Sequence, residues 1–317
     1  MTGLRGWFAD MVVALPYSSC FFKTVPVMFL NLDKLVRGGA EFRDFKKDCY
    51  WEILDSKGVF ARLIFRQGKP YFIHGLDCLD SDSFINAIKR DKRELFLSFN
   101  FLEKGSLGPV IKYLSEEPVL TELDNSSGEL IQLLKSLRKS GESGMISLHI
   151  DSGIALVPIR DGKISKGFLP GRTIQGKALV DFLKSPEGSG MAEFIDGEVA
   201  EPSALGIGEI SLILSAVNAW LESLGPVWPQ SRALVPVYVE KIRSRYPSLE
   251  PLGYNTEDLV SLGSFITDSS DFPKAMALLI KSLCKKHPSP ETALKLFKRI
   301  NKDRTTALKS TGLLDNL

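Results

Sequence analysis

Apolar and polar residues follow the pattern of β-hairpins in two separate stretches of the chain. The first stretch consists of YWEILD and VFARLIF, joined by the polar residues 56–58. The second consists of MISLHI and IALVPI, joined by residues 151–153. Two β-type runs that flank a short polar connection containing glycine are typical of a hairpin. We therefore predict antiparallel strand pairs over residues 50–65 and 145–159.

The elements expected around the two hairpins occur in the same order, which indicates an internal repeat. Each hairpin is preceded by a helical pattern and followed by an R-x-G-K turn, a third strand, a helix and a closing strand. The sequence therefore predicts an α+β fold with two copies of one module: helix, three-stranded antiparallel meander, helix, strand. The supporting segments are helices around Leu32–Val36, Leu130–Leu137, Phe84–Ile88 and Leu179–Leu183, third strands PYFIHG and ISKGFL, and closing strands LFLSFNF and GMAEFI.

The repeated tetrapeptide has a structural explanation. Gly68 and Gly162 fall at the second central position of a two-residue turn, where type I′ geometry needs positive φ, and glycine adopts positive φ with the least strain. The flanking Arg66, Lys69, Arg160 and Lys163 are interpreted as solvated residues at the hairpin tips, with ligand binding as the alternative. A phosphate loop would run into a helix, whereas these turns run into strands.

The second copy resembles the N-terminal module of PatA-type bacterial response regulators, a domain of undefined function. The resemblance is carried by the opening strand from Ser143 to Leu148, the turn Arg160–Lys163 and the helix start from Gly176 to Leu179. The first copy matches less well because Tyr50-Trp51-Glu52 replaces the small residues at its opening. The resemblance implies a regulatory or scaffolding role in signalling, polarity or motility, and it transfers no catalytic residue.

Composition shifts and turn-rich segments suggest where these modules begin and end. Gly, Pro and the Asn-Ser-Ser-Gly cluster mark residues 104–128 as a connector, and GEVAEPSALG marks a change to helical composition. The predicted organisation is an N-terminal extension (1–30) packed on module 1 (31–103), the connector (104–128), module 2 (129–200) and a helical C-terminal domain (201–317).

The C-terminal region has helical spacing and a local excess of positive charge. Helices are expected at 207–224, 233–245, 272–285 and 290–301, the last two with proline at the first helical position. Residues 281–310 contain nine Lys or Arg and two acidic residues. This stretch is interpreted as a solvated helix face, and contact with nucleic-acid phosphates is the alternative. The candidate contacts are Lys295, Lys298, Arg299 and Lys302.

Composition narrows the class of protein. The 317 residues carry a net charge of +2, so no global field favours nucleic acid or an anionic membrane. Four widely spaced cysteines form no C-x-x-C pair and fit a reducing compartment. Residues 11–30 are apolar but are interrupted by Pro16, Lys23 and Pro26, so they do not fit a membrane span or a signal peptide. A cytoplasmic location is expected.

The motifs of common enzymes do not occur in the sequence. Phosphate-binding P-loop, zinc-protease and nucleophile-elbow patterns are absent, and the three histidines lack metal-ligand spacing. Asp77, Asp80 and Asp82 are interpreted as caps of the following helix, with a divalent cation as the alternative. We therefore expect no catalytic, metal or cofactor site. The expected function is that of a non-catalytic regulatory protein that binds a protein partner; the alternative is a nucleic-acid-binding regulator.

Overall fold

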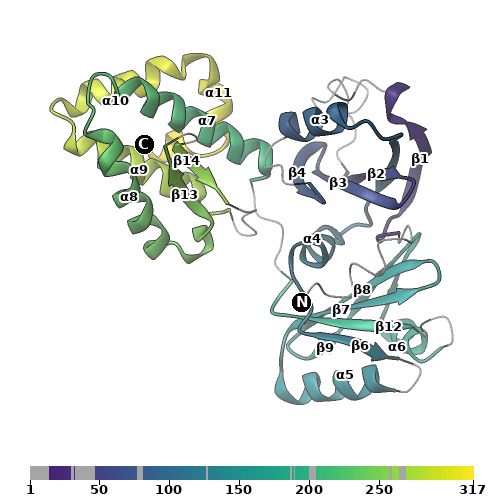
Figure 1. Cartoon of the computed structure of the whole chain (residues 1–317). Helices are drawn as coiled ribbons and strands as arrows, with labels where there is room; N and C mark the ends of the chain where they lie inside the picture. The colour runs from purple at the N-terminus through teal and green to yellow at the C-terminus, as the bar shows by residue number, and fades with distance from the viewer. Residues whose placement is uncertain are drawn as a thin grey trace. The chain divides into compact units, whose positions relative to one another are not determined.

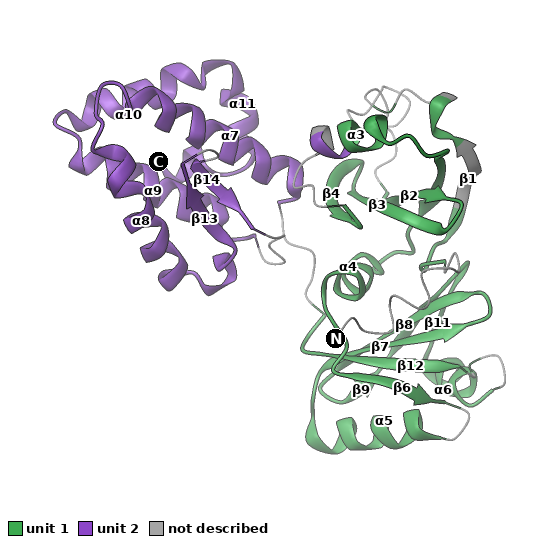
Figure 2. Ribbon diagram, in the orientation of Figure 1, with its two compact units in different colours: residues 1–77, 85–202 green, residues 78–84, 203–317 purple. Residues whose placement is uncertain are grey.

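The computed structural model is a mixed α+β structure with antiparallel sheets, divided into two compact units (Figure 2). Residues 1–77 and 85–202 form the N-terminal unit; residues 78–84 and 203–317 form the C-terminal unit. The structure describes residues 14–29, 32, 47–76, 81–125, 128–185, 188, 190–199, 205–256, 259–263 and 269–317.

The first sheet of the N-terminal unit has five strands in the order β1-β5-β2-β3-β4 (Figure 1). Its centre is apolar and aromatic: the Trp51 ring lies 4.8 Å from Phe65 and 6.4 Å from Phe99, centroid to centroid. Such large buried rings supply much of the hydrophobic stabilisation of a small sheet. The elements are β1 (Ser19–Pro26), β2 (Cys49–Asp55), β3 (Gly58–Arg66), β4 (Lys69–His74), α3 (Ser81–Arg90) and β5 (Phe96–Phe101).

The second sheet, starting from the edge strand β6, has the order β6-β12-β7-β8-β10-β11, and β9 also pairs with β8. Leu148 and Ile146 of its central strand are buried against Leu179 and Phe182 of a helix that follows the meander. The elements are β6 (Leu120–Asp124), α5 (Glu129–Ser140), β7 (Gly144–Ile150), β8 (Gly153–Arg160), β9 (Lys163–Ile164), β10 (Lys166–Leu169), β11 (Arg172–Gln175), α6 (Gly176–Leu183) and β12 (Met191–Asp196).

Both R-x-G-K segments form two-residue turns with positive φ at each central residue. Gln67 and Gly68 have φ of 50° and 79°, and Asp161 and Gly162 have φ of 49° and 68°. Positive φ at both positions is the type I′ combination, which matches the right-handed twist of paired strands. The turns join β3 to β4 and β8 to β9, so each one fixes the register of the third strand.

Several segments differ from the sequence-based expectation. Residues 120–124, assigned to a connector, form β6 and pair with β12 at the edge of the second sheet. Residues 19–26, assigned to an extension, form β1 and pair with β5. The expected third strand of the second copy is broken into β9 and β10 and is followed by the unforeseen β11. Strands β6 and β11 are missed because runs of five and four residues show little alternation of apolar and polar positions. Apart from Leu32, the helix expected at Leu32–Val36 lies outside the described residues.

The described residues of the C-terminal unit form helices and one short hairpin, so the expectation of an all-helical region is wrong. Strands β13 (Leu252–Asn255) and β14 (Leu259–Leu262) pair antiparallel. Their four-residue length gives no readable period, which explains why the sequence pattern did not predict them. The helices are α7 (Ile207–Leu224), α8 (Ser231–Arg245), α9 (Phe272–Lys286), α10 (Pro290–Ile300) and α11 (Thr305–Ser310).

Helix α7 packs against α10 in the core of this unit. Trp220 is fully buried, donates a hydrogen bond from Nε1 to the Ala293 carbonyl at 3.0 Å, and packs edge-on against Phe297. Among the described residues, α7 is also the one helix long and apolar enough to cross a membrane. A core helix meets the same length and composition test, and burial of Trp220 and Phe297 in one cluster accounts for the apolar composition here.

Candidate functional site

Helix α4 (Leu107–Ser115) and residues 14–18 lie between the two sheets of the N-terminal unit (Figure 1). Helix α4 contacts β4 of the first sheet and β8 of the second. The Ala14 carbonyl accepts a hydrogen bond from Ile154 N–H at 2.9 Å, and the Leu15 carbonyl accepts one from the Tyr50 hydroxyl at 3.2 Å. Both sheets are therefore tied to the same short stretch of backbone.

A pocket of about 450 Å³ opens beside α4 and is lined by residues from both halves of this unit. We call it the inter-sheet pocket. Its volume is in the range of small-molecule sites, roughly 300–1,000 Å³. The lining residues are Asp48, Arg66, Gln67, Lys104, Gly105, Leu107, Gly108, Pro109, Pro158, Ile159, Arg160, Lys163, Ser165, Lys166, Phe168, Glu198 and Val199.

Positive charge dominates the polar lining of this pocket. Arg66 ends β3, while Arg160 and Lys163 flank the turn between β8 and β9. Lys104 precedes α4, and Lys166 begins β10. The Lys166 Nζ donates a hydrogen bond to the Lys104 carbonyl at 2.9 Å, which connects the loop before α4 to the second sheet. Five cations thus converge from segments far apart in sequence.

Two acidic side chains, Asp48 and Glu198, line the same pocket. The Asp48 carboxylate accepts a hydrogen bond from the backbone N–H of Gln67 at 3.0 Å, which holds it against the turn of the first sheet. The Glu198 side chain is exposed. Since five cations face two carboxylates, the lining has a net positive charge, and an anionic ligand is the complementary partner.

The N-terminal end of α4 adds to this positive potential. The Ser106 hydroxyl donates to the Glu103 carbonyl at 2.8 Å, and no side chain caps the helix. The first N–H groups of a helix have no partner within the helix and carry its positive dipole end. Leu107 and Gly108, which line the pocket, occupy these positions. The positive end of the α4 dipole therefore lies beside the charged side chains.

The structure brings together three of the four basic residues that flank the two R-x-G-K turns. Arg66, Arg160 and Lys163, interpreted as solvated hairpin tips, line one pocket. The described residues lining the pocket do not include Lys69, although Lys69 follows Gly68 as Lys163 follows Gly162. Sequence reasoning missed Lys104 and Lys166, because neither stands in a motif and 62 positions separate them.

No family model, curated protein or solved structure matches the chain.

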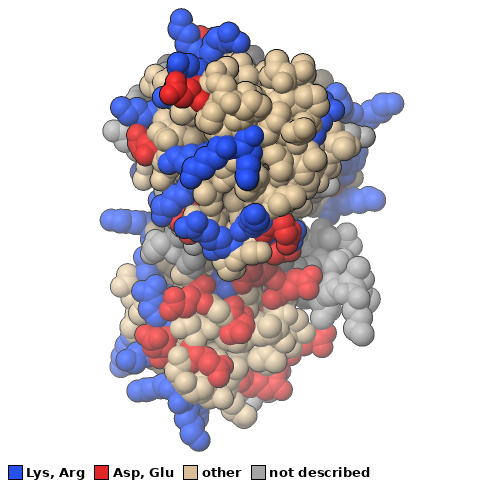
Figure 3. Space-filling model, turned by 90° about the vertical axis from the view of Figure 1, so that its left-hand side faces the viewer, with Lys and Arg blue, Asp and Glu red and all other residues tan. Residues whose placement is uncertain are grey.

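The basic residues singled out in the C-terminal unit lie on its surface. Lys295, Lys298, Arg299 and Lys302 are exposed, and Glu291 pairs with Lys295 at 3.7 Å. Phe297 of the same helix is buried, so the exposed basic residues and the core residue lie on different faces. On the face of this unit seen in the upper part of Figure 3, Lys and Arg side chains lie in several groups, with other residues between the groups.

The predicted acidic cluster falls largely outside the described residues: Asp77 and Asp80 are not described, and Asp82 lies in α3. Within the described residues, no three His, Cys, Asp or Glu side chains are grouped as a metal site would require. His149 lies 3.6 Å from Glu193, whose carboxylate accepts a hydrogen bond from the buried Ser147 hydroxyl.

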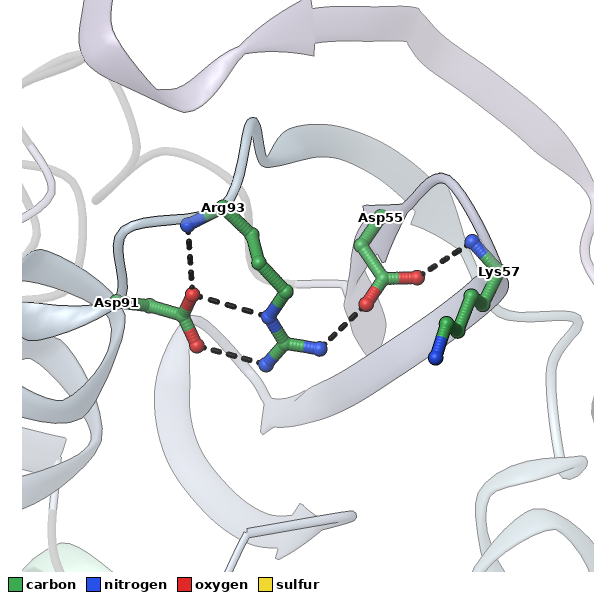
Figure 4. Close-up of polar contacts among 4 residues, drawn as sticks. All are labelled: Asp55, Lys57, Asp91 and Arg93. Atoms are coloured by element: carbon green, nitrogen blue, oxygen red, sulfur yellow. Dashed lines mark hydrogen bonds and ion pairs between the residues drawn. The ribbon is translucent and has the colours of Figure 1, made fainter.

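A separate polar network lies beside the β2–β3 hairpin of the first sheet (Figure 4). Arg93 donates to both Asp91 oxygens, at 3.0 and 2.7 Å, and also pairs with Asp55. The hydrogen bonds from Arg93 lower the pKa of Asp91 to about 2. Asp55 accepts the Lys57 backbone N–H at 2.7 Å. The Arg93 guanidinium is half-exposed and bonded to two carboxylates of the same sheet region, so we interpret this network as structural.

Proposed function

We propose that this chain is a non-catalytic regulatory protein of the bacterial cytoplasm that binds an anionic ligand in its inter-sheet pocket. In this proposal the two sheets belong to two copies of one α+β module, and the C-terminal unit is a separate, mainly helical region. The resemblance of the second copy to the PatA-type module supports a place in signalling, polarity or motility. Ligand binding across the two modules would set the surface offered to a protein partner.

The strand orders support the repeat. Strands β1, β5, β2, β3 and β4 correspond in order to β6, β12, β7, β8 and β10, with a helix before the last strand of each copy. The residue before the first hairpin strand also has the same role in both copies. Asp48 accepts the N–H of Gln67, and Ser143 accepts the N–H of Asp161, both at 3.0 Å.

The observation that carries the proposed function is the convergence of both R-x-G-K turns on one pocket. Arg66 comes from the first turn, and Arg160 and Lys163 come from the second. Guanidinium groups bind planar and tetrahedral oxyanions through paired hydrogen bonds, and lysines add mobile point charges. A pocket whose main polar groups are cations fits anion binding better than proton transfer or nucleophilic attack.

Thermal unfolding of the full chain tests this function. Phosphate and citrate are compared with sodium chloride at equal ionic strength, for wild type and for Arg160→Gln. A ligand that binds only the folded state raises the melting temperature. Because multivalent anions also stabilise proteins without a site, the expected result is a shift in wild type that shrinks in Arg160→Gln. Equal shifts in the two proteins would contradict the proposal.

The exposed basic residues of α10 support a second candidate, nucleic-acid binding by the C-terminal unit. Phosphate contacts release counterions, so such binding weakens steeply between about 50 and 200 mM salt. This candidate predicts DNA or RNA retention at low salt that is lost when Lys298 and Arg299 are replaced by Gln. Absence of retention at low salt would remove it.

A further inference from the structure

We propose that the ligand of the inter-sheet pocket is a small organic diphosphate: two linked phosphates attached to an organic group that covers the apolar part of the lining. This inference rests on the proposed function and adds the chemical class of the ligand. It is drawn from the charge of the pocket, the direction from which its donors come and the apolar part of its lining.

The net positive charge of the pocket lining favours a ligand with more than one anionic group. Three of its cations lie on the second sheet, at Arg160, Lys163 and Lys166, while Arg66 comes from the first sheet and Lys104 from the loop between them. A single carboxylate would neutralise one of these. A phosphate monoester carries about −1.5 to −2 at pH 7, and a second linked phosphate adds further charge and more oxygen acceptors.

The donors approach from several directions, which also favours phosphate over carboxylate. Side-chain donors come from both sheets, and the backbone N–H groups of Leu107 and Gly108 come from the start of α4. A carboxylate offers two oxygens in one plane, whereas a tetrahedral phosphate offers oxygens on several sides. Two linked phosphates present more oxygen acceptors, on more sides, to cations that come from both sheets and from the loop between them.

The size and apolar lining indicate that the phosphates are part of a larger molecule. Phe168, Pro109, Pro158 and Val199 line the same pocket as the cations. The Lys166 Nζ lies 4.7 Å from the centroid of the Phe168 ring, so that ring stands beside the charged part of the pocket. Inorganic pyrophosphate alone would leave the apolar residues uncovered in a volume of about 450 Å³. An organic group would cover them.

Calorimetric titration of the full chain tests the ligand class, with ADP, AMP, pyrophosphate and citrate as probes at one ionic strength. ADP serves as an available organic diphosphate. We expect ADP to bind, pyrophosphate to bind more weakly, and AMP to bind about tenfold more weakly than ADP because it loses charge-assisted hydrogen bonds. Citrate, which has similar charge without phosphate, is expected to bind more weakly than pyrophosphate.

A matched pair of variants locates the binding. Lys163→Ala and Lys69→Ala each remove the lysine after a turn glycine, but only Lys163 lines the pocket. We expect Lys163→Ala to weaken ADP binding about tenfold and Lys69→Ala to leave it unchanged. Unfolding curves of both variants without ligand show whether either has lost its fold.

The results distinguish a failure of the diphosphate proposal from a failure of the proposed anion-binding function. Binding of citrate that depends on Lys163, with no binding of ADP or pyrophosphate, would overturn the diphosphate and keep the anion site. AMP binding as tight as ADP binding would likewise reject the second phosphate. Equal loss in Lys163→Ala and Lys69→Ala, or no binding of any probe, would remove the anion site itself.

Discussion

The backbone N–H of Asp161 donates a hydrogen bond to the Ser143 hydroxyl at 3.0 Å, so the residue before β7 holds the turn that follows β8. Asp48 and Gln67 form the corresponding bond in the first sheet. Each bond closes the open end of a hairpin next to the inter-sheet pocket. The two turns are thereby fixed in position, and Arg66, Arg160 and Lys163 extend from pre-ordered backbone.

Replacing Gly162 with Ala should destabilise the second sheet more than the same change at Gly171. Both glycines have positive φ, which costs an alanine roughly 1 kcal/mol. A Cβ at Gly162 would also lie 2.3 Å from the Leu137 carbonyl oxygen, whereas at Gly171 it would meet nothing within 4 Å. Urea unfolding of the full chain, with hydrogen exchange to assign the affected sheet, measures the difference. If both variants lost the same free energy of unfolding, α5 would have moved away from the new Cβ without an energetic cost.

Neutralising Glu198 should strengthen anion binding. Glu198 lines the inter-sheet pocket and opposes its cations, so Glu198→Gln is expected to raise the affinity for pyrophosphate about two- to fivefold, as expected for a single charge near a protein surface. Glu117→Gln, an exposed residue away from the pocket, changes the net charge equally and is the control. The same gain in both variants would show that only overall charge matters.

The described cysteines should be unreactive in the folded protein. Burial, with a smaller effect from Asp48, raises the pKa of Cys49 to about 12, and burial raises the pKa of Cys284 to about 11. In a variant with Cys20 and Cys78 replaced by Ser, a thiol reagent at pH 8 should react only after unfolding, because the thiolate is the reactive form. Rapid labelling of the native protein would contradict this burial.

The same shifts predict how stability depends on pH. Unfolded thiols ionise near pH 8.5, whereas the folded thiols stay protonated to higher pH. The contribution of the Cys49 thiol to the free energy of unfolding is therefore fully present below about pH 8.5. It is lost as the pH rises toward 12. Cys49→Ala should flatten this alkaline loss in urea unfolding measured from pH 8 to 10.

Removing the Arg93 side chain should raise the pKa of the Asp91 carboxyl to the usual range of an aspartate. Hydrogen bonds from Arg93 hold the pKa of Asp91 near 2. The ionised carboxylate therefore adds to the free energy of unfolding above about pH 4, and this stabilisation is lost as the pH falls toward 2. In Arg93→Ala, the carboxyl ¹³C shifts of Asp91 should titrate with a pKa in the ordinary range of an aspartate, about 3.9. Arg90→Ala, at the exposed end of α3, should leave the titration unchanged.

The long amphipathic helices and the hairpins were predictable from the sequence because their periods extend over many residues. Helix 207–224 was expected with the bounds of α7, and 272–285 differs from α9 by one residue. Strands β6, β11, β13 and β14 were missed, since runs of four or five residues do not show a period.

The pocket could not be predicted from the sequence. Arg66 and Arg160 stand 94 positions apart, and each has an ordinary explanation at its own hairpin tip. Their common site depends on α4 and on residues 14–18, which hold the two sheets together. Local patterns do not encode that packing, so the convergence of the turns is visible only in three dimensions.

The central claim is that turns from both sheets hold one ligand, and the affinity of pyrophosphate for Arg66→Gln and Arg160→Gln tests it most directly. Glutamine keeps the length of the side chain and removes its charge. We predict that each variant keeps its unfolding curve and loses about tenfold in affinity, as measured by calorimetry. Loss in one variant alone, or in neither, would contradict a shared site.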